Sequence, residues 1–239
     1  ADGHTLMLAN TGVMVINPAL YAKLPYQTLR DFVPVARTAM QPLAFLVNPK
    51  VPVNTLPEFI EYVRARPGQV NYGSAGNGGS SHLVPEMLKS ATGIFMVHIP
   101  YNGGNPAQLA LLSGQVDFNM DNLATASTHI QSGKLLPLAV TTAQRSPLLP
   151  QVPTLNETLP GLVIDTWWGL VAPAGTPQDV VQKLHQAFAA ALNDPDTKTR
   201  FAQWMAEPTP SSPAQFGQFM AAERQRYEAV VKQSGAKVD

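Results

Sequence analysis

The chain has 239 residues, a net charge of zero, 45% hydrophobic and 13% charged residues, and no cysteine. This length allows one large domain or two small ones, and the scattered basic residues argue against a nucleic-acid partner. The absence of cysteine excludes disulfides, thiol catalysis and cysteine-ligated zinc, and no stretch is long and apolar enough to insert into a membrane.

The amino-terminal part of the chain predicts a strand followed by turns. Residues 5–10 form an apolar run typical of a buried strand, and residues 11–12 indicate a loop after it. Proline-containing turns are expected at residues 17–18 and 24–26. Short elements joined by turns are therefore predicted here.

A second apolar run at residues 43–47, approached through residues 31–35, predicts another strand, and a helix follows it. Thr55 is expected to cap this helix, with the Glu58 side chain reaching back to its amino terminus. Pro-Gly at residues 67–68 ends it.

The most distinctive stretch runs from residue 69 to residue 90. A β-prone segment at residues 70–72 enters a run of small residues, and helical spacing resumes at Leu83 and Leu88. A strand, a small-residue loop and a helix amino terminus together expose backbone N–H groups at the positive end of a helix dipole, which suits an anion. The alternative is a plain connection between strand and helix. We predict a ligand loop with the binding residues Ser74, Ala75, Gly76, Asn77, Gly78, Ser80 and Ser81.

This loop lacks the spacing of better-known glycine motifs. It has no Gly-x-x-x-x-Gly-Lys-Ser/Thr, which argues against a nucleoside triphosphate, and Ser81 stands where Gly-x-Gly-x-x-Gly needs its third glycine. No serine lies in a Gly-x-Ser-x-Gly hydrolase elbow. The loop is therefore predicted to hold a ligand and not to react with it.

Strands alternate with helices through the middle of the chain. Strands are predicted at residues 95–99, 116–120 and 135–141, with a helix capped by Asn105 and another at residues 123–130. Alternating strands and helices imply a parallel sheet that binds ligands at the carboxyl ends of its strands.

Three further residues are candidates for this site, each with an alternative interpretation. Asp121 either caps the helix that follows Met120 or meets a hydroxyl, amine or protonated carboxyl of the ligand. Tyr101 either reaches the ligand or packs, and Trp167 either walls the cleft or belongs to the core. The histidines show no i, i+4 pair, so we predict no metal, no cofactor and no catalytic residue.

The carboxyl-terminal part predicts an apolar extended segment at residues 163–171 and then helices. Thr176 is expected to cap the first of these, and the others occupy residues 195–205 and the stretch from residue 212 onward. The whole pattern suggests two α/β lobes joined by a two-strand hinge, with the ligand in the cleft between them. We place lobe 1 at residues 1–44 and 170–239, and lobe 2 at residues 45–169.

Many ordered motifs of this chain are found in one known family. Together they resemble the extracytoplasmic solute receptors of tripartite tricarboxylate transporters, often called Bug receptors, over essentially the whole chain. The motifs lie at residues 20–21, 24–26, 31–35, 67–78, 98–104, 114–117, 133–135, 138–141, 149–154 and 167–177.

The resemblance implies a type II periplasmic-binding-protein-like fold, a periplasmic location and no enzymatic activity. It implies a small carboxylate ligand, often a dicarboxylate, and transporter subunits in the membrane as partners; we expect a monomer. In the family, a loop matching Ser74 to Ser81 and a second loop from the opposite lobe hold the ligand carboxylates. The second loop has no counterpart here, because Ala1 matches a point some tens of residues into a family member. We therefore expect a processed or trimmed chain that binds its ligand weakly.

Two alternatives to a transport receptor stand. One is a sensor that presents the same class of ligand to a signalling partner. The other is an enzyme that uses the glycine loop as an anion hole, which needs a base near Ser74, Ser80 or Ser81, where only His82 is close in sequence.

Overall fold

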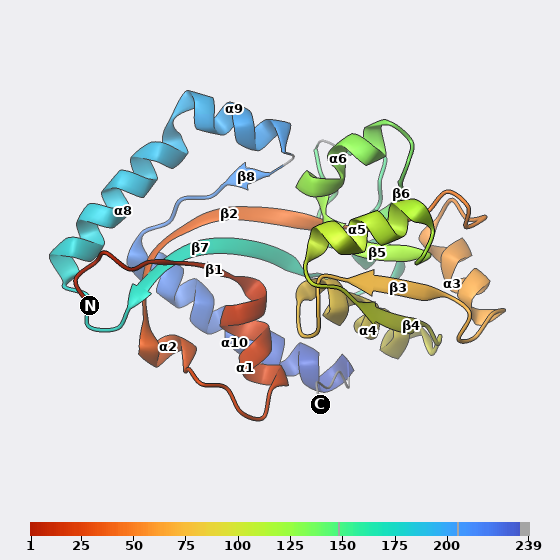
Figure 1. Ribbon diagram of the computed structural model, residues 1–239, viewed down its shortest axis with the longest axis horizontal. Coiled ribbons are helices and arrows are strands. Elements are labelled where there is room, and N and C mark those ends of the chain that lie inside the picture. Colours follow the sequence, from red (N-terminus) through yellow and green to blue (C-terminus); the bar gives the residue numbers. More distant parts are fainter. Residues whose placement is uncertain (148, 205, 235–239) are drawn as a thin grey trace. The chain divides into compact units, whose positions relative to one another are not determined.

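The computed structural model describes residues 1–147, 149–204 and 206–234. The chain divides into two compact units, of which unit 1 comprises Ala1–Gln41 and Thr166–Lys232, and unit 2 comprises Pro42–Asp165 (Figure 1). The divisions expected at residues 44/45 and 169/170 fall within the same two strands, β2 (Phe32–Val47) and β7 (Asp165–Pro173). The final residues of the predicted lobe 1, 235–239, lie outside the described part.

Strand β2 is longer than the strand that we expected at residues 43–47, because it also takes in the approach from residue 32. It runs without a break through Pro42, which falls between two sets of strand pairs: Ala39 and Met40 face β8 (Glu207–Pro208), and β5 pairing begins at Leu43. Proline has no N–H to donate to a neighbouring strand, so it is tolerated at this position, where β2 stops pairing with β8 and has not yet begun to pair with β5.

Unit 1 contains an antiparallel pair of strands and the helices near both ends of the chain. In this pair β1 (Met7–Asn10) lies against β7 with Ala9 opposite Gly169, which confirms the first predicted strand in shortened form. The helices of the unit are the π-helical turn η1 (Gly12–Ile16), α1 (Asn17–Leu20), α2 (Thr28–Asp31), α8 (Gln178–Asn193), α9 (Pro195–Gln203) and α10 (Pro213–Ser234).

Three predictions in unit 1 were wrong. The expected loop at residues 11–12 and turn at residues 17–18 are occupied by η1 and α1, where Met14, Val15 and Ile16 are buried and Pro18 sits in the first turn of α1. Thr176 does not cap α8, since the Thr176 hydroxyl donates to the Pro173 carbonyl oxygen and the helix begins at Gln178. The helix expected at residues 195–205 ends at Gln203, and Met205 lies outside the described residues.

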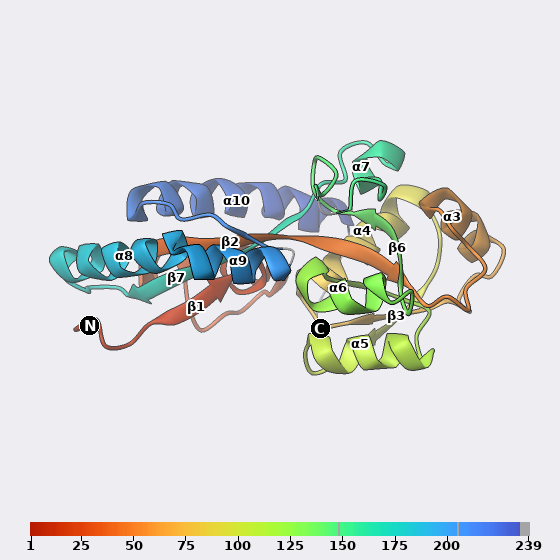
Figure 2. The same ribbon diagram turned by 90° about the horizontal axis from the view of Figure 1, so that it is seen from above.

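Unit 2 confirms the alternation of strands and helices. Its strands are β3 (Asn71–Ser74), β4 (Val97–Pro100), β5 (Phe118–Asn122), β6 (Leu136–Val140) and the second part of β2. Its helices are α3 (Leu56–Arg64), α4 (Ser80–Thr92), α5 (Gly104–Ser113), α6 (Leu123–Gln131) and α7 (Leu155–Thr158). Within this unit α3 and α4 lie on one side of the sheet and α5 on the other (Figure 2).

The sheet of unit 2 has the order β6-β2-β5-β3-β4. Strand β2 is antiparallel to both β5 and β6, while β3 is parallel to β5 and β4. Because β3, β4 and β5 run in the same direction, their carboxyl ends meet at one edge, as the sequence predicted. Phe45, Phe59 and Phe118 pack together beneath this sheet at ring-centroid separations of 4.7–5.0 Å.

Local capping explains where the helices of unit 2 begin. Thr55 caps α3 as predicted, accepting from the Glu58 N–H, while the Glu58 carboxylate accepts from the Asn54 N–H. Helix α5 begins at Gly104, before the predicted cap Asn105, because Gly103 adopts a φ of 106° that favours glycine. Among the residues that the structure describes, no helix is both long and apolar enough to cross a membrane.

Candidate functional site

The candidate site lies in unit 2, where β3, β4 and β5 end. The loop at residues 74–81 follows β3, Tyr101 follows β4, and Asp121 lies near the end of β5. Backbone hydrogen bonds connect the first two loops: the Tyr101 N–H donates to the Ser74 carbonyl at 3.0 Å, and the Gly103 N–H donates to the Ala75 carbonyl at 3.2 Å.

Asp121 adjoins the second of these loops. A β-carbon placed on Gly104 would lie 3.8 Å from Asp121 Oδ1. The structure thus brings together the loop residues, Tyr101 and Asp121 at one edge of the sheet, all within unit 2.

Side chains and backbone amides fix the shape of the loop at residues 74–81. Ser81 Oγ accepts from the Ala75 N–H at 3.0 Å, and Ser74 Oγ accepts from the Gly76 N–H at 3.2 Å. Gly76 and Gly78 have φ values of 126° and 79°, which L side chains rarely adopt. The glycines therefore serve the conformation of the loop.

The loop ends at the amino terminus of α4. Gly79 is the cap, and its carbonyl accepts from the N–H groups of His82 and Leu83. The N–H groups of Ser80 and Ser81 lie before these first helical donors, at the positive end of a helix of 13 residues. This geometry is suited to an anion.

The predicted loop residues differ in exposure. Ala75 and Asn77 are exposed, Gly76, Ser80, Ser81 and Tyr101 are half-buried, and Ser74 and Gly78 are buried. This surface therefore presents backbone and mainly small side chains.

Two histidines contact the loop at residues 74–81, and the sequence did not predict either contact. His82 lies in the first turn of α4 and His98 on β4, and their rings stack at a centroid separation of 4.1 Å. His98 Nε2 lies 2.6 Å from Ser74 Oγ, and His82 Nδ1 accepts from the Gly78 N–H at 3.2 Å. In the sequence only His82 is close to the serines of the loop, and the contact between His98 and Ser74 depends on the register of β3 with β4.

The contact between Ser74 and His98 resembles the nucleophile–base pair of a hydrolase. Ser74 is only 1% exposed, however, and its hydroxyl also contacts the Gly76 carbonyl at 3.1 Å. Burial lowers the pKa of His98 to about 4, which makes it a weak base. The arrangement supports the loop and does not present a nucleophile to a substrate.

Asp121 is buried with three hydrogen bonds. Its Oδ1 accepts from the Asn122 N–H at 2.7 Å and from the Thr125 hydroxyl at 3.1 Å, and its Oδ2 accepts from Gln108 Nε2 at 3.0 Å. The cap of α6 is Asn122, so Asp121 lies one residue before the capping position. Burial raises the pKa of this carboxyl to about 6.

Trp167 belongs to unit 1 and lies in its core. Its side chain is fully buried, and its ring makes edge contacts with Phe216 and Phe219 at centroid distances of 5.5 and 5.6 Å. Of the two interpretations given to this residue, the structure shows the core position. Its side chain has no exposed surface to offer a ligand.

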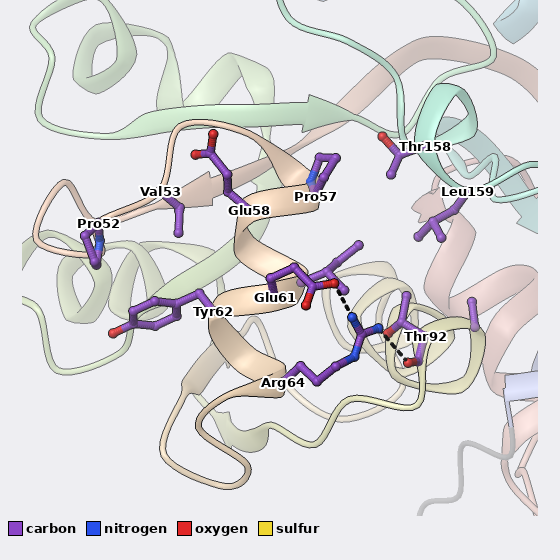
Figure 3. Close-up of a pocket in the computed structure, with 12 residues that line it drawn as sticks. Pro52, Val53, Pro57, Glu58, Glu61, Tyr62, Arg64, Thr92, Thr158 and Leu159 are labelled. Carbon is purple, nitrogen blue, oxygen red and sulfur yellow. Dashed lines mark hydrogen bonds and ion pairs between the residues drawn. The ribbon is translucent and has the colours of Figure 1, made fainter.

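The described residues contain a hollow but no group that could hold a metal ion. No group of three or more acidic, histidine or cysteine side chains among them could hold a metal ion. Figure 3 shows a hollow on unit 2 lined by α3 and by the ends of α4 and α7, including Glu61, Thr92 and Leu159. Its lining includes none of the residues predicted to bind the ligand.

Comparison with known proteins places the chain in a family. Residues 1–236 match the sequence model of the tripartite tricarboxylate transporter family receptors. Protein BugT of Bordetella pertussis (strain Tohama I) is 35% identical over 240 residues, which cover 100% of this chain and 74% of BugT.

Solved structures give the same result. Rpa4515 of R. palustris with adipate has 33% identity and a TM-score of 0.94, covering 99% of this chain and 80% of that one. MatC (Rpa3494) from Rhodopseudomonas palustris with bound malate has 34% identity and a TM-score of 0.91, covering 96% and 80%. The periplasmic binding protein BugD has 32% identity and a TM-score of 0.93, covering 99% and 80%.

These likenesses confirm the predicted periplasmic-binding-protein-like fold of two α/β lobes. The chain belongs to the receptor family of the tripartite tricarboxylate transporters, whose members are solute receptors and not enzymes.

Proposed function

We propose that this protein is a periplasmic solute receptor that binds a small dicarboxylate at the loop of residues 74–81 and delivers it to a tripartite tricarboxylate transporter. The observation that supports the site most strongly is the row of backbone N–H groups at the start of α4, next to Gly76 and Gly78 in left-handed conformations. The relatives Rpa4515, with adipate, and MatC, with malate, support a dicarboxylate ligand. BugD supports the periplasmic location, and we propose a monomer.

Neutral groups supply the binding energy in this proposal. Between Arg66 and Lys134 the one cationic side chain is Lys89, and Glu86 engages it at 2.8 Å. A carboxylate at the loop is therefore held by backbone N–H groups and by the hydroxyls of Ser80 and Ser81.

The magnitudes allow this. A charge-assisted hydrogen bond contributes about 1.5–3 kcal/mol, and a helix amino terminus adds up to about 2 kcal/mol in partly buried geometry. Micromolar affinity requires about 8 kcal/mol after the ordering costs of association. Three or four such contacts supply about 4.5–12 kcal/mol before those costs, and the helix terminus adds to this, so we expect these groups alone to bind a carboxylate weakly.

Thermal-shift measurements against a panel of ligands test the proposal. The chain is melted with mono-, di- and tricarboxylates, including adipate and malate, and with nucleotides at the same ionic strength. A ligand that binds only the folded state raises the melting temperature in proportion to ln(1 + [L]/Kd). We expect stabilisation by dicarboxylates. Stabilisation by nucleotides with none by carboxylates would contradict the proposal.

A further inference from the structure

The loop at residues 74–81 rests on a stacked pair of imidazole rings. The His82 and His98 rings are 9° from parallel with centroids 4.1 Å apart, and Tyr72 stacks on the opposite face of the pair, on His98, at 4.8 Å. His82 is 7% exposed, so at least this ring is withdrawn from solvent.

Each ring holds a different part of the loop. His98 Nε2 contacts Ser74 Oγ at 2.6 Å, at the point where the loop leaves β3. His82 Nδ1 accepts from the Gly78 N–H at 3.2 Å, just before α4 begins. The two contacts bracket Ala75, Gly76 and Asn77, of which Ala75 and Asn77 are exposed.

We propose that His82 and His98 are positioning residues that hold the ligand loop in its binding conformation, and that they do so only while both rings are neutral. This inference rests on the proposed function, because it concerns the same loop. The hydrogen-bond chemistry of the rings carries the argument.

A protonated imidazole has a donor on both nitrogens and no acceptor. Protonation of His82 therefore turns the acceptor of the Gly78 N–H into a second donor, and the contact becomes repulsive. Protonation of the neighbouring ring places a like charge 4.1 Å away, face to face.

The Ser74 hydroxyl depends on His98 in a similar way. Ser74 Oγ accepts from the Gly76 N–H and has a single proton to donate, with His98 Nε2 at 2.6 Å and the Gly76 carbonyl at 3.1 Å within reach. A neutral His98 with a free lone pair on Nε2 accepts a hydrogen bond from the Ser74 hydroxyl. Protonation of His98 reverses the bond and moves the serine proton toward the Gly76 carbonyl.

The groups facing this pair do not favour its charging. Glu86 of α4 is occupied by the Tyr72 hydroxyl at 2.6 Å and by Lys89 at 2.8 Å. Burial lowers the pKa of both histidines, that of His98 to about 4, against the opposing attraction of Glu86. Both rings are therefore neutral at pH 7, and the loop loses its support as the pH falls from about 6.5 toward about 4.

Matched substitutions at His82 test the inference by calorimetry with adipate and malate at pH 7.5 and pH 4.5. The Oδ1 of His82→Asn stands near the Nδ1 position and accepts without titrating, whereas His82→Phe keeps a ring and removes the acceptor. At pH 7.5 we expect His82→Asn to bind like the wild type and His82→Phe to bind about fivefold more weakly. The ratio of wild-type to His82→Asn affinity should fall by up to about fivefold between the two pH values as the His82 ring takes up a proton, and this ratio cancels the titration of the ligand and of Asp121. Equal affinities for all three proteins at both pH values would overturn the inference.

Amide NMR decides the inference without a ligand. In the wild type, the Gly78 amide resonance is expected to titrate with the same midpoint as the His82 ring, and in His82→Asn this titration should be lost. A Gly78 amide that does not follow His82 overturns the positioning role even if carboxylates bind. If no carboxylate binds the wild type, the proposed function fails, and the amide titration still gives its own answer about the loop.

Discussion

The side-chain amide of Asn119 occupies the space that a β-carbon on Gly73 would need. That carbon would lie 2.4 Å from Asn119 Oδ1, and the same oxygen accepts from the Gly73 N–H at 2.9 Å. Asn119 Nδ2 donates to the Ala107 carbonyl at 2.7 Å. One buried side chain thus connects the strand that leads into the ligand loop with α5.

Replacing Asn119 by leucine should leave the N–H of Gly73 without its side-chain acceptor. We expect a loss of about 2–4 kcal/mol in the free energy of unfolding, measured by urea denaturation, because each orphaned buried group costs about 1–3 kcal/mol. Asn105→Leu, at an exposed position on α5, is the control and should change stability little. Equal effects of the two substitutions would contradict the role given to Asn119.

Valine at Gly78 should abolish carboxylate binding while the protein still melts cooperatively. The φ of 79° is strained for a β-branched residue, at a cost of about 1–3 kcal/mol, so the loop changes shape. Gly76→Val should act similarly, at a φ of 126°.

Gly161→Val is the control for these loop variants. Gly161 has a φ of 87°, and a β-carbon there would meet no described atom within 4 Å. Its valine variant should lose comparable stability and keep its ligand affinity in calorimetry. Unchanged affinity in Gly76→Val and Gly78→Val would move the site elsewhere.

Asp121→Asn should stabilise the protein at neutral pH. The pKa of about 6 in the folded state lies above the ordinary 3.8, so the contribution of this carboxyl is fully present below about pH 3.8 and is lost as the pH rises through about 6. A neutral amide avoids burying the charge, and Gln108 can turn its own amide to face it. We expect a gain of about 2–3 kcal/mol at pH 7.5 and little change at pH 4, measured by denaturation at both values. A loss of stability at pH 7.5 would show that the charged form is favoured by its hydrogen bonds.

Gly169→Ala should destabilise the core of unit 1. A β-carbon at this position would lie 2.2 Å from Phe216 Cζ, on a buried aromatic ring. Overpacking of this kind costs about 1–3 kcal/mol. The double variant Gly169→Ala/Phe216→Leu should recover part of that loss in a double-mutant cycle, and strict additivity would argue against the contact.

The sequence predicted the strand, loop and helix of residues 69–90 well because their signals are local. The small residues of the loop lie between a β-prone segment at residues 70–72 and a segment with apolar residues at helical spacing. The observed β3 and α4 lie close to these two segments. The parallel arrangement of β3, β4 and β5 follows from alternation along the chain, which needs no knowledge of distant contacts.

What the sequence did not predict depends on tertiary packing. Pro18 has the same local signature whether it marks a turn or opens a helix, and the burial of Met14 to Ile16 decides for the helix. The stack of His82 on His98 joins residues on different elements, so no spacing rule detects it. The apolar segment around Trp167 looks the same in sequence whether the tryptophan lines a cleft or belongs to the core. Only its contacts with Phe216 and Phe219 place it in the core.

We propose that a dicarboxylate binds to the backbone N–H groups at the start of α4. Titration of the isotopically labelled chain with adipate, followed through its amide resonances, tests this most directly. We predict saturable shifts centred on Gly76, Gly78, Ser80 and Ser81, which disappear in Gly78→Val. Saturable binding that leaves these four resonances in place, with shifts around the hollow beside α3 instead, would contradict the account.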